Sequence, residues 1–212
     1  MTEQRKSIQQ NALKLACFAA ACTALVSAVN WFTSPLIAEQ LQLQTERQMQ
    51  EVLPEKIVFG GFDAHCFSNI SQQFLGTAEA LPSWQIEKES QAVATVYQTV
   101  APDGYNGDIL LLVGIDDNDT VTGVRVLQHS ETPGLGDKLE LRKSDWINSF
   151  AGQRLNSDED SRWAVKKDGG QFDSFTGATI TPRAVVKAVR NTQLFHQTHA
   201  SVDDANLQPC EQ

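Results

Sequence analysis

Hydrophobic and polar positions divide the chain into an apolar segment near the front and a longer mixed remainder. No charged residue occurs from Leu15 to Ala38, a run of 24 residues rich in Ala, Leu, Val and Phe. A helix needs roughly 20 apolar residues to cross the hydrocarbon layer of a membrane. The pattern therefore predicts a transmembrane anchor over residues 15–38, preceded by a short N-terminus over residues 1–14.

Charges beside this run predict its orientation. Arg5, Lys6 and Lys14 lie before it, against the single acid Glu3. Because positive charge beside the first apolar segment keeps that end in the cytoplasm, we expect residues 1–14 to be cytoplasmic and the bulk of the chain to be exported.

A cleaved signal peptide is the alternative interpretation of the apolar run. Val26, Ser27 and Ala28 resemble the small-residue cleavage site of such a peptide. Apolar character continues through Trp31 and Phe32, which favours an anchor that is retained. Both interpretations export the rest of the chain.

Beyond the anchor, a Gln- and Glu-rich segment has a loose helical pattern of apolar residues and ends near Pro54. It predicts a helical stalk over residues 39–59, followed by one exported domain over residues 60–212. Residues 60–83 contain Gly60, Gly61, Gly76 and Pro82 and favour irregular loops.

Three runs rich in β-branched and aromatic residues follow, separated by turn-forming sequences, and predict an antiparallel meander. They cover residues 92–100, 108–116 and 120–129. A helix over residues 144–151 and a short strand over 163–166 come next.

A final helix is predicted over residues 182–196, with Thr181 as its N-cap and Pro182 at its first position. Its expected inward-facing residues recur at helical spacing. They are Val185, Ala188, Val189, Thr192 and Phe195. The exported part is thus expected to be an α+β domain with an antiparallel sheet and flanking helices.

Composition excludes some classes of function. The net charge of −9 and the pI near 4.9 disfavour nucleic-acid binding, which needs a cationic surface. Four cysteines occur without a CxxC pair or zinc-type spacing, so we expect no metal site in this chain. Cys66 and Cys210 lie in the exported part, where oxidising conditions permit a disulfide between them.

Two segments have the composition of ligand-binding turns. Residues 173–182, DSFTGATITP, lead into the last predicted helix, whose N-terminus favours an anion. Lys166, Lys167 and Arg183 are candidate counter-charges. Residues 129–138, HSETPGLGDK, contain two glycines behind a proline, so the backbone of this loop can lie against a flat ligand. Taken alone, the first segment is explained better as a capped turn without a ligand, and the second, as a loop between two elements, is also a weak signal.

Together, ETPGLG and the later D-x-x-T-G-A-T resemble the FMN-binding domain of exported electron-transfer proteins. The resemblance also covers APDGYNGDILLLVGID and WAVKKDGGQFD. The family includes the G subunit of the Rnf-type ion-translocating complex and the C subunit of the sodium-pumping NADH:quinone reductase. The short chain and the compact stretch between anchor and meander resemble the Rnf-type member more closely.

The resemblance implies that FMN is bound covalently through a phosphoester to Thr179, where a separate flavin transferase attaches it. Thr176, Gly177, Ala178 and Asp173 complete the attachment motif. Further expected contacts are made by a lysine, which offsets the phosphodiester charge, and by the glycine-rich loop, which meets the isoalloxazine ring or the ribityl chain. These residues are Lys167, Glu131, Thr132, Gly134, Leu135 and Gly136. Tyr105 is a further candidate neighbour of the ring.

The resemblance further implies a redox protein without a catalytic centre of its own, in a translocase that couples ferredoxin and NAD chemistry to ion transport. Its expected partners are other membrane and iron–sulfur subunits in a bacterial inner membrane, with the domain in the periplasm. No GxGxxG motif occurs, so NAD is expected on a partner. Two alternatives stay open: the quinone-reductase member of the family, and a flavin-free assembly protein that only docks its neighbours.

Overall fold

The computed structural model describes residues 2–59, 61–199 and 208–210. It contains two compact units, Met1–Glu46 and Arg47–Gln212. The first unit consists of helix α1, Thr2–Val52, whose last residues belong to the second unit. Within α1, the stretch Asn11–Ile37 is long and apolar enough to cross a membrane, and none of it is buried.

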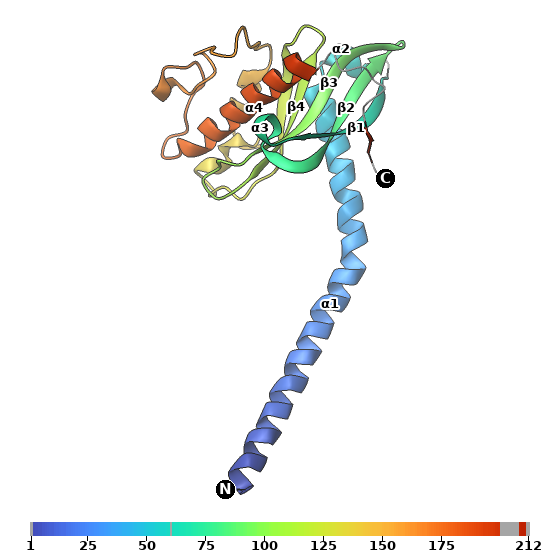
Figure 1. The fold of residues 1–212 in the computed structure, drawn as a ribbon, viewed down its shortest axis with the longest axis vertical. Coiled ribbons are helices and arrows are strands. Elements are labelled where there is room, and N and C mark those ends of the chain that lie inside the picture. The colour runs from blue at the N-terminus through green and yellow to red at the C-terminus, as the bar shows by residue number, and fades with distance from the viewer. Residues whose placement is uncertain (1, 60, 200–207, 211–212) are drawn as a thin grey trace. The chain divides into compact units, whose positions relative to one another are not determined.

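The second unit is an α+β domain built on one antiparallel sheet, as the sequence predicts (Figure 1). Its strand order is β5-β4-β3-β2-β1-β6. The strands are β1, Asp63–Ser71; β2, Thr77–Lys88; β3, Gln91–Ala101; β4, Ile109–Asp116; β5, Val121–Gln128; and β6, Gln208–Pro209. The helices are α2, Glu55–Val58; α3, Gln72–Leu75; and α4, Ile180–His199, with 3-10 helices η1, Gly136–Leu139; η2, Asp145–Phe150; and η3, Lys166–Asp168.

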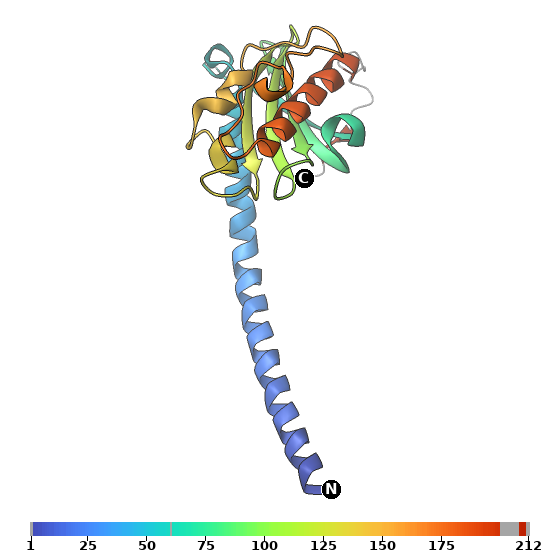
Figure 2. The same cartoon turned by 90° about the vertical axis from the view of Figure 1, so that its left-hand side faces the viewer.

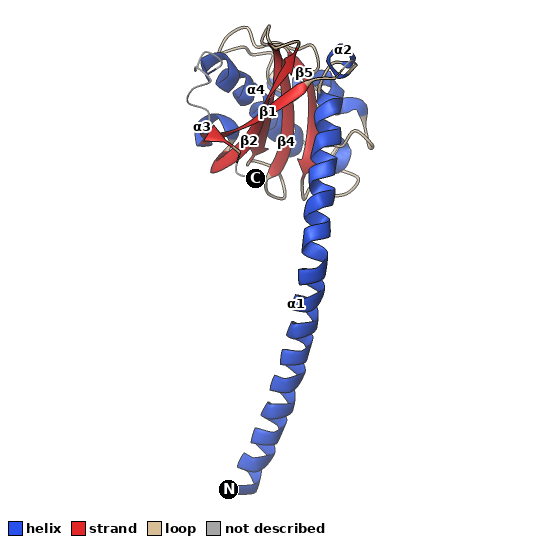
Figure 3. Cartoon of the chain, turned by 90° about the vertical axis from the view of Figure 1, so that its right-hand side faces the viewer, coloured by secondary structure: helices blue, strands red, loops and turns tan. Residues whose placement is uncertain are grey.

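Both faces of the sheet are covered. Helix α4 crosses one face, in front of the strands in Figure 2 and behind them in Figure 3. Its predicted stripe of inward residues is confirmed, because all five are buried. On the other face, a second apolar cluster joins the sheet to Met49, Val52, Leu53 and Ile57. The compact unit therefore begins at Arg47 and not at the predicted residue 60, because this segment supplies core side chains.

The predicted meander is confirmed as β3, β4 and β5, which pair in sequence order. The loops predicted over residues 60–83 are wrong, because this stretch forms β1, α3 and β2. Its polar, Gly- and Pro-containing sequence hides these elements, and pairing against β3 supplies the missing order. Gly76 ends α3 in the left-handed region at φ 77°, where a Cβ would lie 2.1 Å from the Val100 carbonyl oxygen.

Three local predictions are corrected in the second half of the domain. The helix predicted over residues 144–151 is the 3-10 helix η2, Asp145–Phe150. No strand forms over residues 163–166, where Val165 makes only an isolated bridge to Phe172. Helix α4 begins at Ile180, so Thr181 lies in its first turn and is not its N-cap.

A disulfide joins Cys66 of β1 to Cys210, which follows β6, with 5.6 Å between the Cα atoms. Strand β6 pairs with β1 beside it, at Phe67 and Ser68. The bond therefore holds the end of the chain to an edge of the sheet.

A pair of glycines lets the end of α1 lie directly on the sheet. Gly114 of β4 and Gly123 of β5 are cross-strand partners. A Cβ on Gly123 would lie 2.9 Å from the Val52 Cα, and one on Gly114 would lie 2.9 Å from the Val52 carbonyl oxygen. That oxygen accepts a 2.6 Å hydrogen bond from the Thr122 hydroxyl. Any side chain at either glycine would push the helix end away.

We expect Gly123→Ala to destabilise the domain by about 1–3 kcal/mol, because its methyl group would press on backbone that is already fixed. Denaturant unfolding of the full chain in detergent measures the loss. Gln128→Ala, at an exposed position of the same strand, is the control and should leave the midpoint nearly unchanged. A Gly123→Ala midpoint equal to wild type would contradict this packing.

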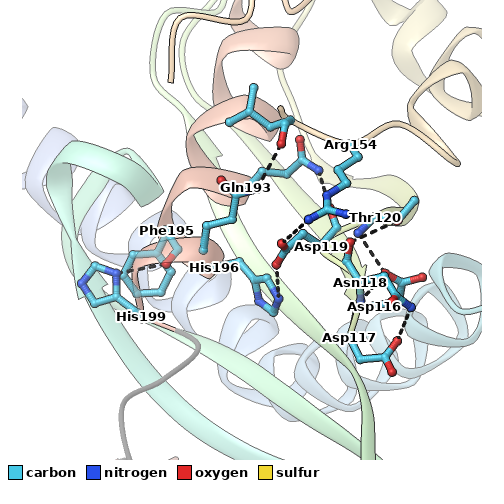
Figure 4. A network of polar contacts seen from close by, with 12 residues as sticks. Asp116, Asp117, Asn118, Asp119, Thr120, Arg154, Gln193, Phe195, His196 and His199 are labelled. Carbon is cyan, nitrogen blue, oxygen red and sulfur yellow. Dashed lines mark hydrogen bonds and ion pairs between the residues drawn. The ribbon is translucent and has the colours of Figure 1, made fainter. Parts of the chain in front are cut away.

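A buried histidine connects α4 to the sheet and to the turn between β4 and β5 (Figure 4). His196 Nδ1 lies 2.9 Å from the Tyr97 hydroxyl, and Nε2 lies 3.7 Å from Asp119 Oδ1. Burial lowers the pKa of His196 below its ordinary value of 6.5, although Asp119 and Asp116 act in the opposite direction. Burial also raises the pKa of Tyr97, so its hydroxyl stays protonated.

This histidine predicts a loss of stability on acidification. Below about pH 6.5 the unfolded chain binds a proton at His196, whereas the folded chain, with its lowered pKa, binds it less readily. The free energy of unfolding therefore decreases as the pH is lowered. The melting temperature of the full chain, measured from pH 7.5 to pH 5, should fall less steeply in His196→Gln than in wild type. His199→Gln, at an exposed position of the same helix, should keep the wild-type slope. Parallel curves for wild type and His196→Gln would contradict the assignment.

Candidate functional site

The segment before α4 forms a tight turn that rests on aromatic side chains. Phe175 and Ala178 form a bridge across it, and Gly177 takes φ 85°, a left-handed conformation that favours glycine. The Phe175 ring packs edge-on against Trp146, with 4.9 Å between the centroids. The Trp146 indole N–H donates a 2.8 Å hydrogen bond to the Asp173 carbonyl oxygen. The backbone of the turn is thus held by the half-buried side chain of Trp146.

The glycine-rich loop is closed by backbone hydrogen bonds. The amides of Leu135 and Gly136 both donate to the Thr132 carbonyl oxygen, at 3.2 and 3.1 Å. Gly134 makes the reversal possible with φ 78°. At the start of the loop, the Glu131 amide donates a 3.0 Å hydrogen bond to His129 Nδ1.

These two segments, far apart in the sequence, line one cavity of about 270 Å³. A third segment, the turn that contains Tyr105, completes its wall. The lining residues are Tyr105, Glu131, Thr132, Leu135, Gly136, Gly177, Ala178, Thr179, Ile180 and Thr181. Sequence reasoning named most of them, and the cavity shows that the two candidate motifs belong to one site.

Four residues of the predicted set lie outside this lining: Asp173, Thr176, Gly134 and Lys167. Ile180 and Thr181 line the cavity but were not predicted as site residues. Their signal was present, because they directly follow Thr179 in the sequence. A threonine at the start of a helix is explained by capping alone, so the sequence does not by itself place Thr181 in a site.

Two of the three candidate counter-charges are bound to carboxylates. Lys166 Nζ lies 2.6 Å from Asp173 Oδ1, and Arg183 holds Asp168 with two 2.6 Å hydrogen bonds. The hydrogen bond from Arg183 lowers the pKa of Asp168. The charges of both cations are therefore largely balanced within the protein.

Lys167 is arranged differently. Its ammonium donates a 3.3 Å hydrogen bond to the Thr179 hydroxyl oxygen. None of the ion pairs among the described residues involves it. Thr179 is half-buried at the start of α4, and its carbonyl oxygen accepts a hydrogen bond from the Arg183 amide. An anion attached at this hydroxyl would meet both an available cation and the positive end of a 20-residue helix.

The cavity also has an apolar border. Tyr105, Leu135 and Ile180 line it while remaining 66%, 43% and 46% exposed. Large exposed apolar side chains around one opening are typical of a ligand or partner surface. The site thus combines a hydroxyl beside a cation with an apolar border, which suits a ligand that has a phosphate at one end and an aromatic ring at the other.

Comparison with known proteins gives matches over both units. Residues 104–193 match the FMN-binding domain family, and residues 1–52 match the RnfG N-terminal region. The first match contains every residue that lines the cavity.

Curated relatives cover nearly the whole chain. A protein of Shewanella piezotolerans is 47% identical over 92% of each chain, and one of Shewanella loihica is 50% identical over 90% of each. A protein of Escherichia coli O157:H7 is 48% identical over 91% of this chain and 93% of its own. All three are named as the G subunit of an ion-translocating oxidoreductase complex.

Proposed function

Because the chain belongs to the family of G subunits of ion-translocating oxidoreductase complexes, we propose that it is a membrane-anchored electron-transfer protein that carries FMN on Thr179. The observation that supports this most directly is the hydroxyl of Thr179. It lies in the lining of a cavity and bonds to a lysine that has no carboxylate partner among the described residues. Of the two members of the flavoprotein family that the motifs resemble, the relatives favour the Rnf type over the quinone reductase.

The residues of the cavity fit FMN. Lys167 and the start of α4 would hold the phosphate, and the apolar border of Tyr105, Leu135 and Ile180 would hold the ring. Gly177 leaves room in the turn before Thr179, because it has no side chain. A Cβ at this position would lie only 3.2 Å from Leu135 Cδ2. When bound, FMN supplies a centre that accepts and releases one or two electrons.

A covalent phosphoester would keep the cofactor on the protein outside the cytoplasm, where a dissociated flavin is lost by diffusion. The phosphate of FMN is not activated, so a transferase needs a flavin dinucleotide as donor. The Thr179 Oγ1–phosphorus bond forms as the phosphoanhydride bond breaks, a nucleoside monophosphate leaves, and the hydroxyl proton is released. In this step Lys167 would stabilise the charge at the acceptor oxygen.

The remaining work of the complex is assigned to partners. The apolar stretch of α1 carries no charged residue between Leu15 and Ala38, so it offers no ion path. Other membrane and iron–sulfur subunits would bind NAD and move the ion. With Arg5, Lys6 and Lys14 on the cytoplasmic side of a bacterial inner membrane, the domain would lie in the periplasm.

We expect Thr179→Val to abolish covalent flavin, because the variant keeps the shape of the side chain and removes the acceptor oxygen. The full chain is produced with its anchor in cells that hold the flavin transferase, denatured, and examined on a gel for flavin fluorescence. Thr198→Val is the matched control, since Thr198 is an exposed threonine of α4 that belongs neither to the attachment motif nor to the cavity lining. Its band should stay as bright as wild type.

A dark wild-type band, with the transferase active on a control substrate, would overturn covalent attachment. If the wild-type band is not fluorescent and denaturation of the protein releases no flavin, the flavin-free assembly protein is favoured instead. A fluorescent Thr179→Val band would move the attachment to another residue.

We also expect Lys167→Gln to slow flavin loading by up to about fivefold, as the loss of one exposed charge contact of about 1 kcal/mol predicts. Loading is followed over time at limiting transferase, in low salt. Lys56→Gln, an exposed lysine of α2, is the control and should load at the wild-type rate. Equal rates in all three proteins would contradict the role of Lys167.

A further inference from the structure

Glu131 lines the cavity, yet both of its carboxylate oxygens are used within the protein. Oε1 accepts a 3.0 Å hydrogen bond from the Asn106 amide, and Oε2 accepts one from the Thr181 hydroxyl. The side chains of Glu131 and Thr181 are buried, at 5% and 0% exposure. This carboxylate therefore joins the loop over residues 131–136 to the turn that contains Asn106 and to the first turn of α4.

Glycines on two of these segments make room for the carboxylate. A Cβ on Gly136 would lie 2.7 Å from Glu131 Oε2 and 3.0 Å from the Thr181 hydroxyl oxygen. A Cβ on Gly104 would lie 2.1 Å from the Gly107 carbonyl oxygen of its own turn and 3.0 Å from Glu131 Oε1. The backbone thus approaches the carboxylate closely at two glycines. Such close packing is expected of a carboxylate that is part of the protein's internal structure, and it is not needed for one that only contacts a ligand.

The three threonines near the end of the turn have different environments. Thr176 is exposed, Thr179 is half-buried beside Lys167, and Thr181 is fully buried with its hydroxyl bound to Glu131. Thr179 and Thr181 are separated by one residue at the start of α4. Fixing Thr181 on the buried carboxylate therefore fixes where the Thr179 hydroxyl lies.

We propose that Glu131 and Thr181 position the flavin acceptor: their hydrogen bond fixes the start of α4 so that the Thr179 hydroxyl faces the cavity and Lys167. In this role Glu131 is a positioning residue and not a ligand of the ring or the ribityl chain. The inference rests on the proposed attachment at Thr179.

The test compares threonine variants in a reconstituted reaction. The full chain is purified in detergent from cells without the transferase, then incubated with purified transferase and flavin adenine dinucleotide. Thr181→Val should lower kcat of loading about tenfold and leave KM for the dinucleotide unchanged, because the donor binds the transferase. Thr181→Ser keeps the hydroxyl and should restore most of the rate. Thr192→Val is the matched control, a buried threonine of α4 whose hydroxyl bonds, among the residues that the structure describes, only to the Ala188 carbonyl oxygen of its own helix.

The outcomes separate the two proposals. Wild type that does not load, with the transferase active on a control, overturns attachment at Thr179 itself. If wild type loads flavin and Thr181→Val loads it equally fast or faster, only the positioning role is overturned. Equal losses in Thr181→Val and Thr192→Val, or in Thr181→Val and Thr181→Ser, also overturn it, because the Glu131 hydrogen bond is then not what matters.

A second variant keeps the test decisive if Thr181→Val is unfolded at the assay temperature. Gly136→Ala leaves both hydrogen-bonding groups in place and pushes a methyl group against Glu131 Oε2. Its kcat of loading should fall several-fold, with KM for the dinucleotide unchanged. A wild-type kcat in a folded Gly136→Ala would overturn the proposal.

Discussion

Burial of the sheet on both faces is the constraint on which the domain depends. Neighbouring residues of the central strands point to opposite faces, so Leu111 and Val113 pack under α4 while Leu112 packs under the segment that begins at Arg47. Neither cover alone would bury these strands. The position of α4 on the sheet is therefore fixed by its row of buried side chains. This also fixes the first turn of α4, where Ile180 and Thr181 line the cavity.

The site follows from this arrangement. Helix α4 presents its N-terminus beside Thr179, the meander brings the turn with Tyr105 alongside, and the glycine-rich loop that follows β5 closes the cavity. The arrangement separates the charges. A buried carboxylate, Glu131, joins the segments from inside, and an exposed cation, Lys167, faces the acceptor hydroxyl. Such a division gives a phosphate an attractive outer environment, while hydrogen bonds satisfy both oxygens of the buried carboxylate.

A covalent bond and close backbone packing hold two edges of the domain. The disulfide between Cys66 and Cys210 holds the edge of the sheet, and the glycine pair in β4 and β5 seats the last turn of α1. The proposed phosphoester would add the tether for the flavin.

The sequence by itself determined the features that depend on local pattern. The apolar run, the three strands of the meander, the inward face of α4 and the two turn motifs follow from periodicity and residue type, and the resemblance of the motifs led to FMN. The hairpin of β1 and β2 could not be predicted, because its residues are polar and become strands only by pairing with β3 and β6. The start of α4 was misplaced for a related reason. Threonine is a common helix cap, so the sequence favours that role for Thr181. Its hydroxyl instead donates to the carboxylate of Glu131, 50 residues away in the sequence, and only the tertiary structure brings the two together.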